Sequence, residues 1–397
     1  MILRTTIIAL LTLAGTPLFS QETFVSFWDP GQKNIRETYQ YRLSGTDTIR
    51  HGSYAIYYID GTIWQKGAYV DGLMEGTWYD YYEDGTPRQV LPYLNGRLNG
   101  KLVYNHPAGN TYQEATYKND LLHGPTVIYH ANGQINETGN YMDGKRHGLV
   151  EGFHENGKMR FSRQYLNGLE HGKQLLYHEN GKIRERSEMA AGKFHGEFRG
   201  FYKEYEDGVL QKICHYRNGL LHGPYMGYYP SGNLMVRCQY ENDSMEGVWI
   251  KHYDLTMPDS LPVIREKGIF RAGEKRGVWT AYYPTGQIYT EGAYVNRKFE
   301  GLWKIYYPNG MLKQKGEYTN GLATGEFQMF YESGKLKNRG HYREDNKTGI
   351  WVTYYESGNI MTEIPFTMGK RHGTAKAYDE SGNLLETLRY ENGEEVR

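Results

Sequence analysis

Histidine is the residue type whose spacing most directly suggests chemistry in this 397-residue chain. One row recurs at steps of 24 or 27 residues and comprises His123, His147, His171, His195 and His222, with His51 and His372 standing apart. A second row has strict steps of 24 and comprises His106, His130, His154 and His178. Imidazoles are common Zn²⁺ ligands, and a zinc site holds each nitrogen about 2 Å from the metal. Alternatively, such a surface changes its charge near about pH 6.5.

Cysteine and tryptophan follow the same spacing. Cys214 and Cys238 are 24 residues apart, and in an oxidising compartment a disulfide is one interpretation. Tryptophan is absent from residues 100–195 and recurs towards the C-terminus as Trp249, Trp279, Trp303 and Trp351. Exposed aromatic rows can hold sugar rings or apolar protein side chains. The alternative is that each ring packs against a glycine of the neighbouring strand.

Catalytic motifs are absent from the sequence. It contains no nucleophile elbow, phosphate-binding loop or His-Glu-x-x-His pair. Acidic residues recur with the period of the chain instead of forming one unique constellation. We therefore expect a protein that is not an enzyme, with no catalytic residues, no cofactor and no metal site.

The elements that position these residues are repeats. Eleven of the thirteen intervals between the glycines that open each unit are 24 residues, and the other two are 27 and 30. These glycines are Gly52, Gly76, Gly100, Gly124, Gly148, Gly172, Gly196, Gly223, Gly247, Gly277, Gly301, Gly325, Gly349 and Gly373. The chain thus has about fourteen units of 24 residues.

Each unit has the pattern of a β-hairpin. In the unit that starts at Gly301, residues 302–307 are aromatic and β-branched, and Pro308-Asn309-Gly310 predicts a tight turn. Residues 312–318 alternate as a second strand, and Asn320-Gly321 predicts the turn to the next unit. Twenty-four residues leave no room for a helix, so the fold class is all-β. In six units a glycine lies two residues before the aromatic residue that closes the second strand.

The spacing of the hairpins argues against both a zinc site and a disulfide. Equivalent positions in adjacent hairpins are two strand spacings apart, about 10 Å. That distance exceeds the limit of about 7 Å for a disulfide and is too long for two imidazoles on one zinc ion. We interpret the cysteines as small residues at a crowded glycine position, and the histidines as turn residues and aromatic substitutes.

The unit resembles the MORN-variant repeat, G-x-W-x-x-Y-Y-x-N-G-x-L-x-x-x-G-x-Y-x-N-G-x-x-x-G. Residues 76–85 and 301–310 are close matches, and the resemblance covers residues 52–393. It implies an elongated single-layer antiparallel β-hairpin repeat ribbon, a MORN-like solenoid. Bacterial proteins of this kind are often described as YwqK-type antitoxins of toxin–antitoxin systems.

The first residues predict export. Arg4 precedes an apolar run from Ile7 to Ala14, and Ser20 is suited to cleavage before Gln21. We expect a signal peptide at 1–20, a lead-in at 21–51 with a degenerate half repeat at 27–31, and the array at 52–397. The mature chain has no stretch apolar enough to span a bilayer, so we expect it to be periplasmic, on the outer surface or secreted.

Two units break the period. One adds three residues between Glu197 and Gly208, and the unit that starts at Gly247 carries a loop insertion at 254–262, which includes Pro258. Insertions in repeats often mark a binding edge, although a loop tip also tolerates neutral change.

The balance of charged residues narrows the range of partners. The 46 basic and 46 acidic residues balance, which argues against nucleic acid. We expect an extracytoplasmic scaffold that binds proteins; a glycan-binding module and an antitoxin or immunity factor are the alternatives. The residues offered as an interaction surface are His106, His130, His154, His178, Trp249, Trp279, Trp303, Trp351 and Pro258.

Overall fold

The computed structural model describes residues 21–203, 208–255 and 262–396. Every regular element within these residues is a β-strand, and none is a helix. Strands that follow one another in the chain pair as antiparallel hairpins, which confirms the predicted all-β hairpin repeat. The predicted signal peptide at 1–20 lies outside the described residues.

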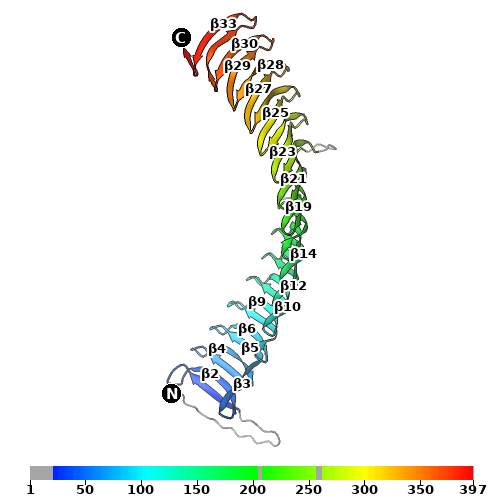
Figure 1. The fold of residues 1–397 in the computed structure, drawn as a ribbon. Coiled ribbons are helices and arrows are strands. Elements are labelled where there is room, and N and C mark those ends of the chain that lie inside the picture. Colours follow the sequence, from blue (N-terminus) through cyan, green and yellow to red (C-terminus); the bar gives the residue numbers. More distant parts are fainter. Residues whose placement is uncertain (1–20, 204–207, 256–261, 397) are drawn as a thin grey trace. The chain divides into compact units, whose positions relative to one another are not determined.

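The chain divides into two compact units, residues 1–193 and 194–397. Figure 1 shows the strands coloured along the sequence. The strands of the first unit are β1 (Glu22–Phe27), β2 (Ile35–Ser44), β3 (Asp47–Tyr57), β4 (Ile63–Val70), β5 (Leu73–Tyr81), β6 (Pro87–Leu94), β7 (Arg97–Leu98), β8 (Gly100–Asn105), β9 (Thr111–Lys118), β10 (Leu121–Tyr129), β11 (Ile135–Met142), β12 (Lys145–Phe153), β13 (Met159–Leu166), β14 (Leu169–Tyr177) and β15 (Ile183–Ala190). The two-residue strand β16 (Lys193–Phe194) falls at the boundary.

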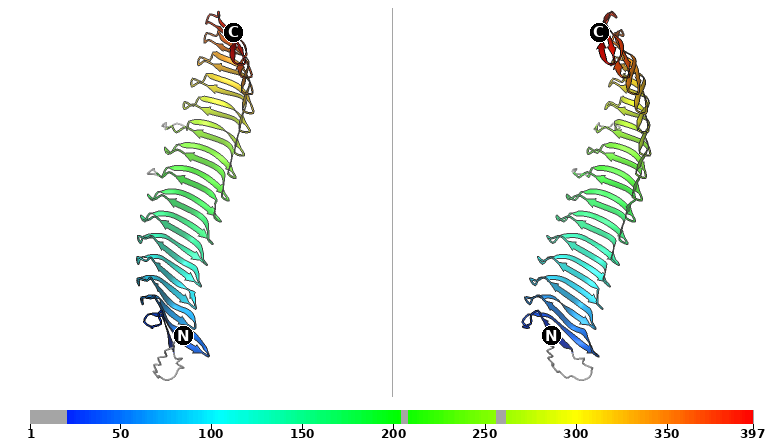
Figure 2. Two further views of the ribbon diagram at one scale, coloured as in Figure 1. Left: turned by 90° about the vertical axis from the view of Figure 1, so that its left-hand side faces the viewer. Right: turned by 60° about the vertical axis from the view of Figure 1, so that its left-hand side comes forward.

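The strands of the second unit are β17 (Gly196–Phe201), β18 (Leu210–Arg217), β19 (Leu220–Tyr228), β20 (Leu234–Glu241), β21 (Ser244–His252), β22 (Ile264–Arg271), β23 (Glu274–Tyr282), β24 (Ile288–Val295), β25 (Lys298–Tyr306), β26 (Leu312–Thr319), β27 (Leu322–Phe330), β28 (Leu336–Arg343), β29 (Asn346–Tyr354), β30 (Ile360–Thr367), β31 (Lys370–Arg371), β32 (Gly373–Tyr378), β33 (Leu384–Glu391) and β34 (Glu394–Val396). Within each unit successive strands lie side by side in one layer (Figure 2).

The repeat that starts at Gly301 illustrates the turns. Tyr307 begins the first turn, and its carbonyl accepts the N–H of Gly310 at 2.9 Å. Gly310 has a φ of 85°, the left-handed value that the sequence predicted for it. The second turn places Asn320 and Gly321 at φ of 53° and 87°, as a two-residue hairpin turn requires.

The lead-in is also a hairpin. Residues 27–31, expected as half a repeat, form the turn region between β1 and β2, which pair from Glu22 with Tyr41 to Phe27 with Ile35. Asp29 closes this turn by accepting the backbone N–H groups of Lys33 and Asn34 at 3.2 and 2.8 Å.

One face of each sheet carries most of the large rings, and we call it the aromatic face. In the second unit its buried cluster consists of Ala323, Phe327 and Trp351, packed against Tyr318, Tyr342 and Phe366. In the first unit Trp78, Leu91 and Leu102 form the corresponding cluster. Because strand side chains alternate, the residues between them point to the opposite face.

Candidate functional site

The second aromatic position of each first strand links neighbouring repeats. The hydroxyl of Tyr307 donates to the carbonyl of Phe330 at 2.9 Å, and the hydroxyl of Tyr331 donates to that of Tyr354 at 2.7 Å. His130 occupies the same position, and its Nε2 lies 3.0 Å from the carbonyl of Phe153. His130 therefore substitutes for a tyrosine in an inter-repeat hydrogen bond, which confirms the interpretation of an aromatic substitute.

The other histidines of this row also sit at the hairpin turn. The carbonyls of His106, His154 and His178 each accept a turn glycine N–H at 2.8 to 2.9 Å. The ring of His106 packs edge-on against Tyr112, with centroids 4.9 Å apart. Nε2 of His154 is buried and has no hydrogen-bond partner. Within the described residues no three His, Cys, Asp or Glu side chains are grouped closely enough to hold a metal ion.

Two histidines before an opening glycine contact the turn between repeats. Nδ1 of His51 lies 3.0 Å from the carboxylate of Asp71 and 3.3 Å from its backbone nitrogen, and Nδ1 of His123 lies 3.2 Å from the carboxylate of Asp143. In a repeat without this histidine, the Glu75 carboxylate accepts the N–H of the equivalent turn residue, Asn95, at 2.8 Å. In contrast, Nδ1 of His147 and Nδ1 of His222 are buried and have no hydrogen-bond partner among the described residues, so the turn contact does not extend to the whole row.

The tryptophans require a correction. Trp279 and Trp351 are only 3% and 4% exposed, so they belong to the core and not to an accessible surface. A Cβ atom added to Gly268 or Gly340 would lie 2.2 Å from the ring of Trp279 or Trp351, respectively. The predicted packing of a ring on a strand glycine is therefore confirmed for both residues.

The half-buried tryptophans differ from each other. Trp303 lies on Gly292, and its indole N–H donates to the carbonyl of Ala293 at 3.1 Å. At the position that corresponds to Gly292, the strand before Trp249 carries Cys238.

Both cysteines are buried and neither is in a disulfide, which confirms the prediction. Tyr225 of β19 pairs with Cys214 of β18 on one side and with Cys238 of β20 on the other. A complete strand therefore separates the two cysteines. Burial raises the pKa of Cys238 from 9.0 to about 11, so its thiol stays neutral near pH 7.

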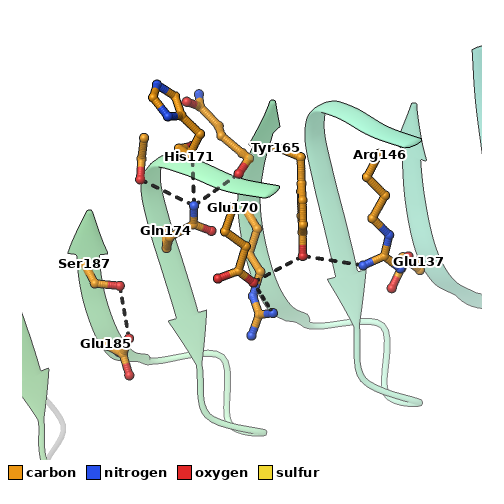
Figure 3. A network of polar contacts seen from close by, with 11 residues as sticks. Glu137, Arg146, Tyr165, Glu170, His171, Gln174, Glu185 and Ser187 are labelled. Carbon is orange, nitrogen blue, oxygen red and sulfur yellow. Dashed lines mark hydrogen bonds and ion pairs between the residues drawn. The ribbon is translucent and has the colours of Figure 1, made fainter. Parts of the chain in front are cut away.

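A polar network lies in the C-terminal part of the first unit (Figure 3). Arg146 donates to the carboxylate of Glu137 at 2.5 Å and to the hydroxyl of Tyr165 at 3.5 Å. That hydroxyl donates to Glu170, which also accepts a bond from Arg163 at 2.8 Å. Burial lowers the pKa of Arg146, but hydrogen bonds with tyrosine hydroxyls and the charge of Glu137 outweigh it and raise the pKa overall.

Gln174 stands where other repeats have tryptophan. Its Nε2 donates to the carbonyl of Gln164 at 3.2 Å, just as Trp351 donates to the carbonyl ten residues before it. Gln174 is 2% exposed, and its Oε1 has no partner (Figure 3). The charged groups of the network are paired with one another, and Gln174 takes the place of a core tryptophan. We therefore interpret the network mainly as a replacement for the aromatic core.

The long loop of the second unit is closed at its base. The N–H of Tyr253 donates to the carbonyl of Val263 at 2.9 Å, and Asn233 of the preceding turn donates to the carboxylate of Asp254 at 3.0 Å. Pro258 lies outside the described residues.

An aliphatic stripe crosses the opposite face of the second unit. Val248 pairs with Ile269 and Val278 pairs with Ala293, on the adjacent strands β21 to β24. Leu302 of β25 continues the stripe. Val248 and Val278 are 58% and 63% exposed, and Ile269 and Leu302 are also exposed. Sequence reasoning missed this stripe, although its signal is simple: an aliphatic residue directly follows the opening glycine in three consecutive units.

The position after the opening glycine varies along the chain. It is polar or charged in four units, as Ser53, Thr77, Lys101 and Lys173, whereas Leu149 and Ile350 are exposed aliphatic residues at this position outside the stripe. Exposed apolar side chains gathered on one face of a sheet favour contact with a protein partner. No described segment is a helix capable of spanning a membrane.

Comparison with known proteins gives one clear match. A family model described as MORN repeat variant matches ten segments that together cover more than half of the chain: residues 74–95, 122–143, 146–167, 170–190, 221–242, 275–296, 299–320, 323–344, 347–367 and 371–392. No curated protein matches.

Similar solved structures include the crystal structure of TcdB2-TccC3-TEV, with 11% identity, a TM-score of 0.18, and coverage of 93% of this chain and 22% of that chain. Another is the Photorhabdus luminescens Tc holotoxin pore, with 9% identity, a TM-score of 0.15, and coverage of 93% and 26%. This chain thus spans about a quarter of those chains, and TM-scores this low add nothing to its assignment.

Proposed function

Because this chain belongs to the MORN repeat variant family, we propose that it is a non-catalytic, extracytoplasmic scaffold that binds a protein partner. Repeat arrays offer broad sheet surfaces on which a few exposed positions vary while the core stays constant. The observation that carries the proposal is the aliphatic stripe of Val248, Ile269, Val278, Ala293 and Leu302.

The stripe suits a protein surface better than a glycan. Its exposed side chains are aliphatic, with neither the flat ring nor the hydrogen-bonding groups with which proteins hold sugars. Arg276 of β23 pairs with Ile269, and Glu300 of β25 pairs with Ala293, so residues of opposite charge lie next to the apolar side chains on the same face. An apolar centre with a polar rim is the usual anatomy of a protein interface.

The test compares the double variant V248K/V278K with the control Thr374→Lys, which changes the equivalent position of a repeat outside the stripe. A partner captured from the extracytoplasmic fraction is identified, purified and titrated against each protein. We expect the double variant to bind at least about tenfold more weakly, since charge enters the apolar centre. The control should bind like the natural chain.

Unchanged affinity of V248K/V278K for that partner would contradict the proposal. Binding to a glycan array without any protein partner would favour the glycan module instead, and neutralisation of a cytoplasmic toxin would favour an antitoxin. Export has its own test, since the purified mature chain should begin at Gln21. A chain beginning at Met1 would remove the extracytoplasmic assignment.

A further inference from the structure

The aromatic face of the second unit contains a hollow of about 270 Å³, between β19 and β21. It lies on the opposite side of the sheet from the aliphatic stripe, since Trp249 faces it and the adjacent Val248 belongs to the stripe. Its lining residues are Tyr225, Met235, Val236, Cys238, Tyr240, Met245, Trp249 and Lys251.

The hollow exists because one ring is displaced from its usual place. Trp78, Trp279, Trp303 and Trp351 each pack edge-on against the closing aromatic residue of the preceding repeat, with centroids 5.0 to 5.2 Å apart. Trp249 makes no such contact with Tyr240, and its ring lies 5.4 Å from that of Trp279. Its distance of 6.2 Å from Phe270 is the one that Trp78 and Trp279 also keep from the closing aromatic residue of their own repeats. The gap between Tyr240 and Trp249 is the hollow.

One departure from the repeat explains the displacement. Cys238 stands where Gly268, Gly292 and Gly340 receive a tryptophan ring, and a side chain at that position excludes the ring.

The lining defines the chemistry of an occupant. Aromatic rings, two thioethers and a buried thiol form an apolar wall, and methionine side chains adapt their shape to different apolar groups. Lys251 adds one positive charge, and it forms no ion pair among the described residues. The volume is below the roughly 300–1,000 Å³ of pockets for drug-sized ligands, so it fits a single bulky side chain.

We propose that this hollow is a socket for one bulky apolar side chain of a protein partner, with an acidic residue beside it that pairs with Lys251. The proposal rests on the proposed function, because the occupant belongs to a protein. The socket adds a second contact point, on the face of the sheet opposite the aliphatic stripe. A protein partner fills it independently of the stripe.

The experiment uses the mature chain and two blocked tripeptides, acetyl-Asp-Phe-Asp-amide and acetyl-Asp-Ala-Asp-amide, with binding followed by saturation-transfer NMR. The phenylalanine peptide should receive saturation on its ring, and the alanine peptide should not. Cys238→Gly should weaken binding at least tenfold, because Trp249 can then lie over the glycine and close the hollow. Lys251→Glu should weaken binding at least threefold by repelling the peptide carboxylates.

The matched control is Cys214→Gly, which changes the other buried thiol but no lining residue and should leave peptide binding intact. Equal binding of the two peptides, or unchanged binding by Cys238→Gly, would overturn the socket. Octanoate that binds in the hollow while the phenylalanine peptide does not would assign it to a lipid chain instead. Should Cys238→Gly fail to fold, unchanged binding by the surface variant Lys251→Glu would still refute the proposal.

The two proposals fail separately. Peptide binding that persists in V248K/V278K, with loss of the captured partner, supports both surfaces. If V248K/V278K binds the captured partner as tightly as the natural chain does, the stripe is refuted but the socket is not, because the tripeptides are tested without the partner.

Discussion

Replacing Gly340 with alanine tests the ring-on-glycine packing that builds the aromatic face. A Cβ at this position would lie 2.2 Å from Cδ2 of Trp351, far inside van der Waals contact. Trp351 is buried among Phe327, Tyr342 and Phe366, so the ring has no free space in which to move. We therefore expect Gly340→Ala to destabilise this part of the sheet by about 1–3 kcal/mol, the range for overpacked cores.

The chain itself contains a repeat in which both the glycine and the tryptophan of this contact are replaced. Ala115 occupies the equivalent glycine position, and the residue across from it is Thr126 in place of a tryptophan. Trp351→Thr alone should cost about 3–5 kcal/mol by opening a cavity. In that background Gly340→Ala has no ring to meet and should stabilise the strand by about 0.5–1 kcal/mol. The coupling between the two changes is then about 1.5–4 kcal/mol.

Native-state hydrogen exchange is the suitable assay, because stability in a repeat array is local and whole-chain unfolding is not a single two-state step. The double-mutant cycle consists of the natural chain, Gly340→Ala, Trp351→Thr and the double variant. The amides of β28 and β29 report the local stability of each protein, and those of β4 and β5 in the first unit serve as an internal reference. Additive effects of Gly340→Ala and Trp351→Thr would show that the ring does not rest on the glycine, and would refute the packing argument.

Three further predictions follow from single side chains. Tyr331→Phe removes the hydroxyl that donates to the Tyr354 carbonyl at 2.7 Å, and it should lower local stability at β29 by about 0.5–1.5 kcal/mol in the same exchange experiment. Burial, with a further contribution from Arg237, lowers the pKa of His252 below its ordinary 6.5, so the unfolded chain takes up this proton more readily. Stability around β21 should therefore fall as pH drops below about 6.5, and His252→Phe should remove that fall; an identical pH dependence in the variant would contradict the assignment. Burial raises the pKa of Cys238 to about 11, so iodoacetamide at pH 8 should alkylate it about a hundredfold more slowly than in the urea-unfolded chain, as mass spectrometry would show. Equal rates would mean that the thiol is not buried.

The buried thiol also has a consequence at high pH. A folded pKa above the unfolded value of 9.0 adds stability that is fully present below pH 9 and is lost as pH rises towards about 11.

The period of the sequence was sufficient to predict the hairpins and their turns. Asn320-Gly321 adopts the two left-handed conformations expected of it, because only such residues take positive φ without strain. The strand spacing alone kept Cys214 and Cys238 apart, and the structure confirms that they form no disulfide. Among the histidines, His51 and His123 contact a turn carboxylate, and His130 substitutes for a tyrosine.

Sequence reasoning could not say which rings are hidden and which surfaces are open. The same tryptophan position is buried in Trp279 and half-buried in Trp249 and Trp303, although Trp279 and Trp303 both lie on a glycine and Trp249 does not. That outcome depends on contact between strands ten or more residues apart. The sequence by itself determined the class, period and turns, since these follow from local backbone preferences. Only the tertiary structure decided where the aliphatic stripe is exposed and where a displaced ring leaves a hollow, because both depend on side-chain packing between neighbouring repeats.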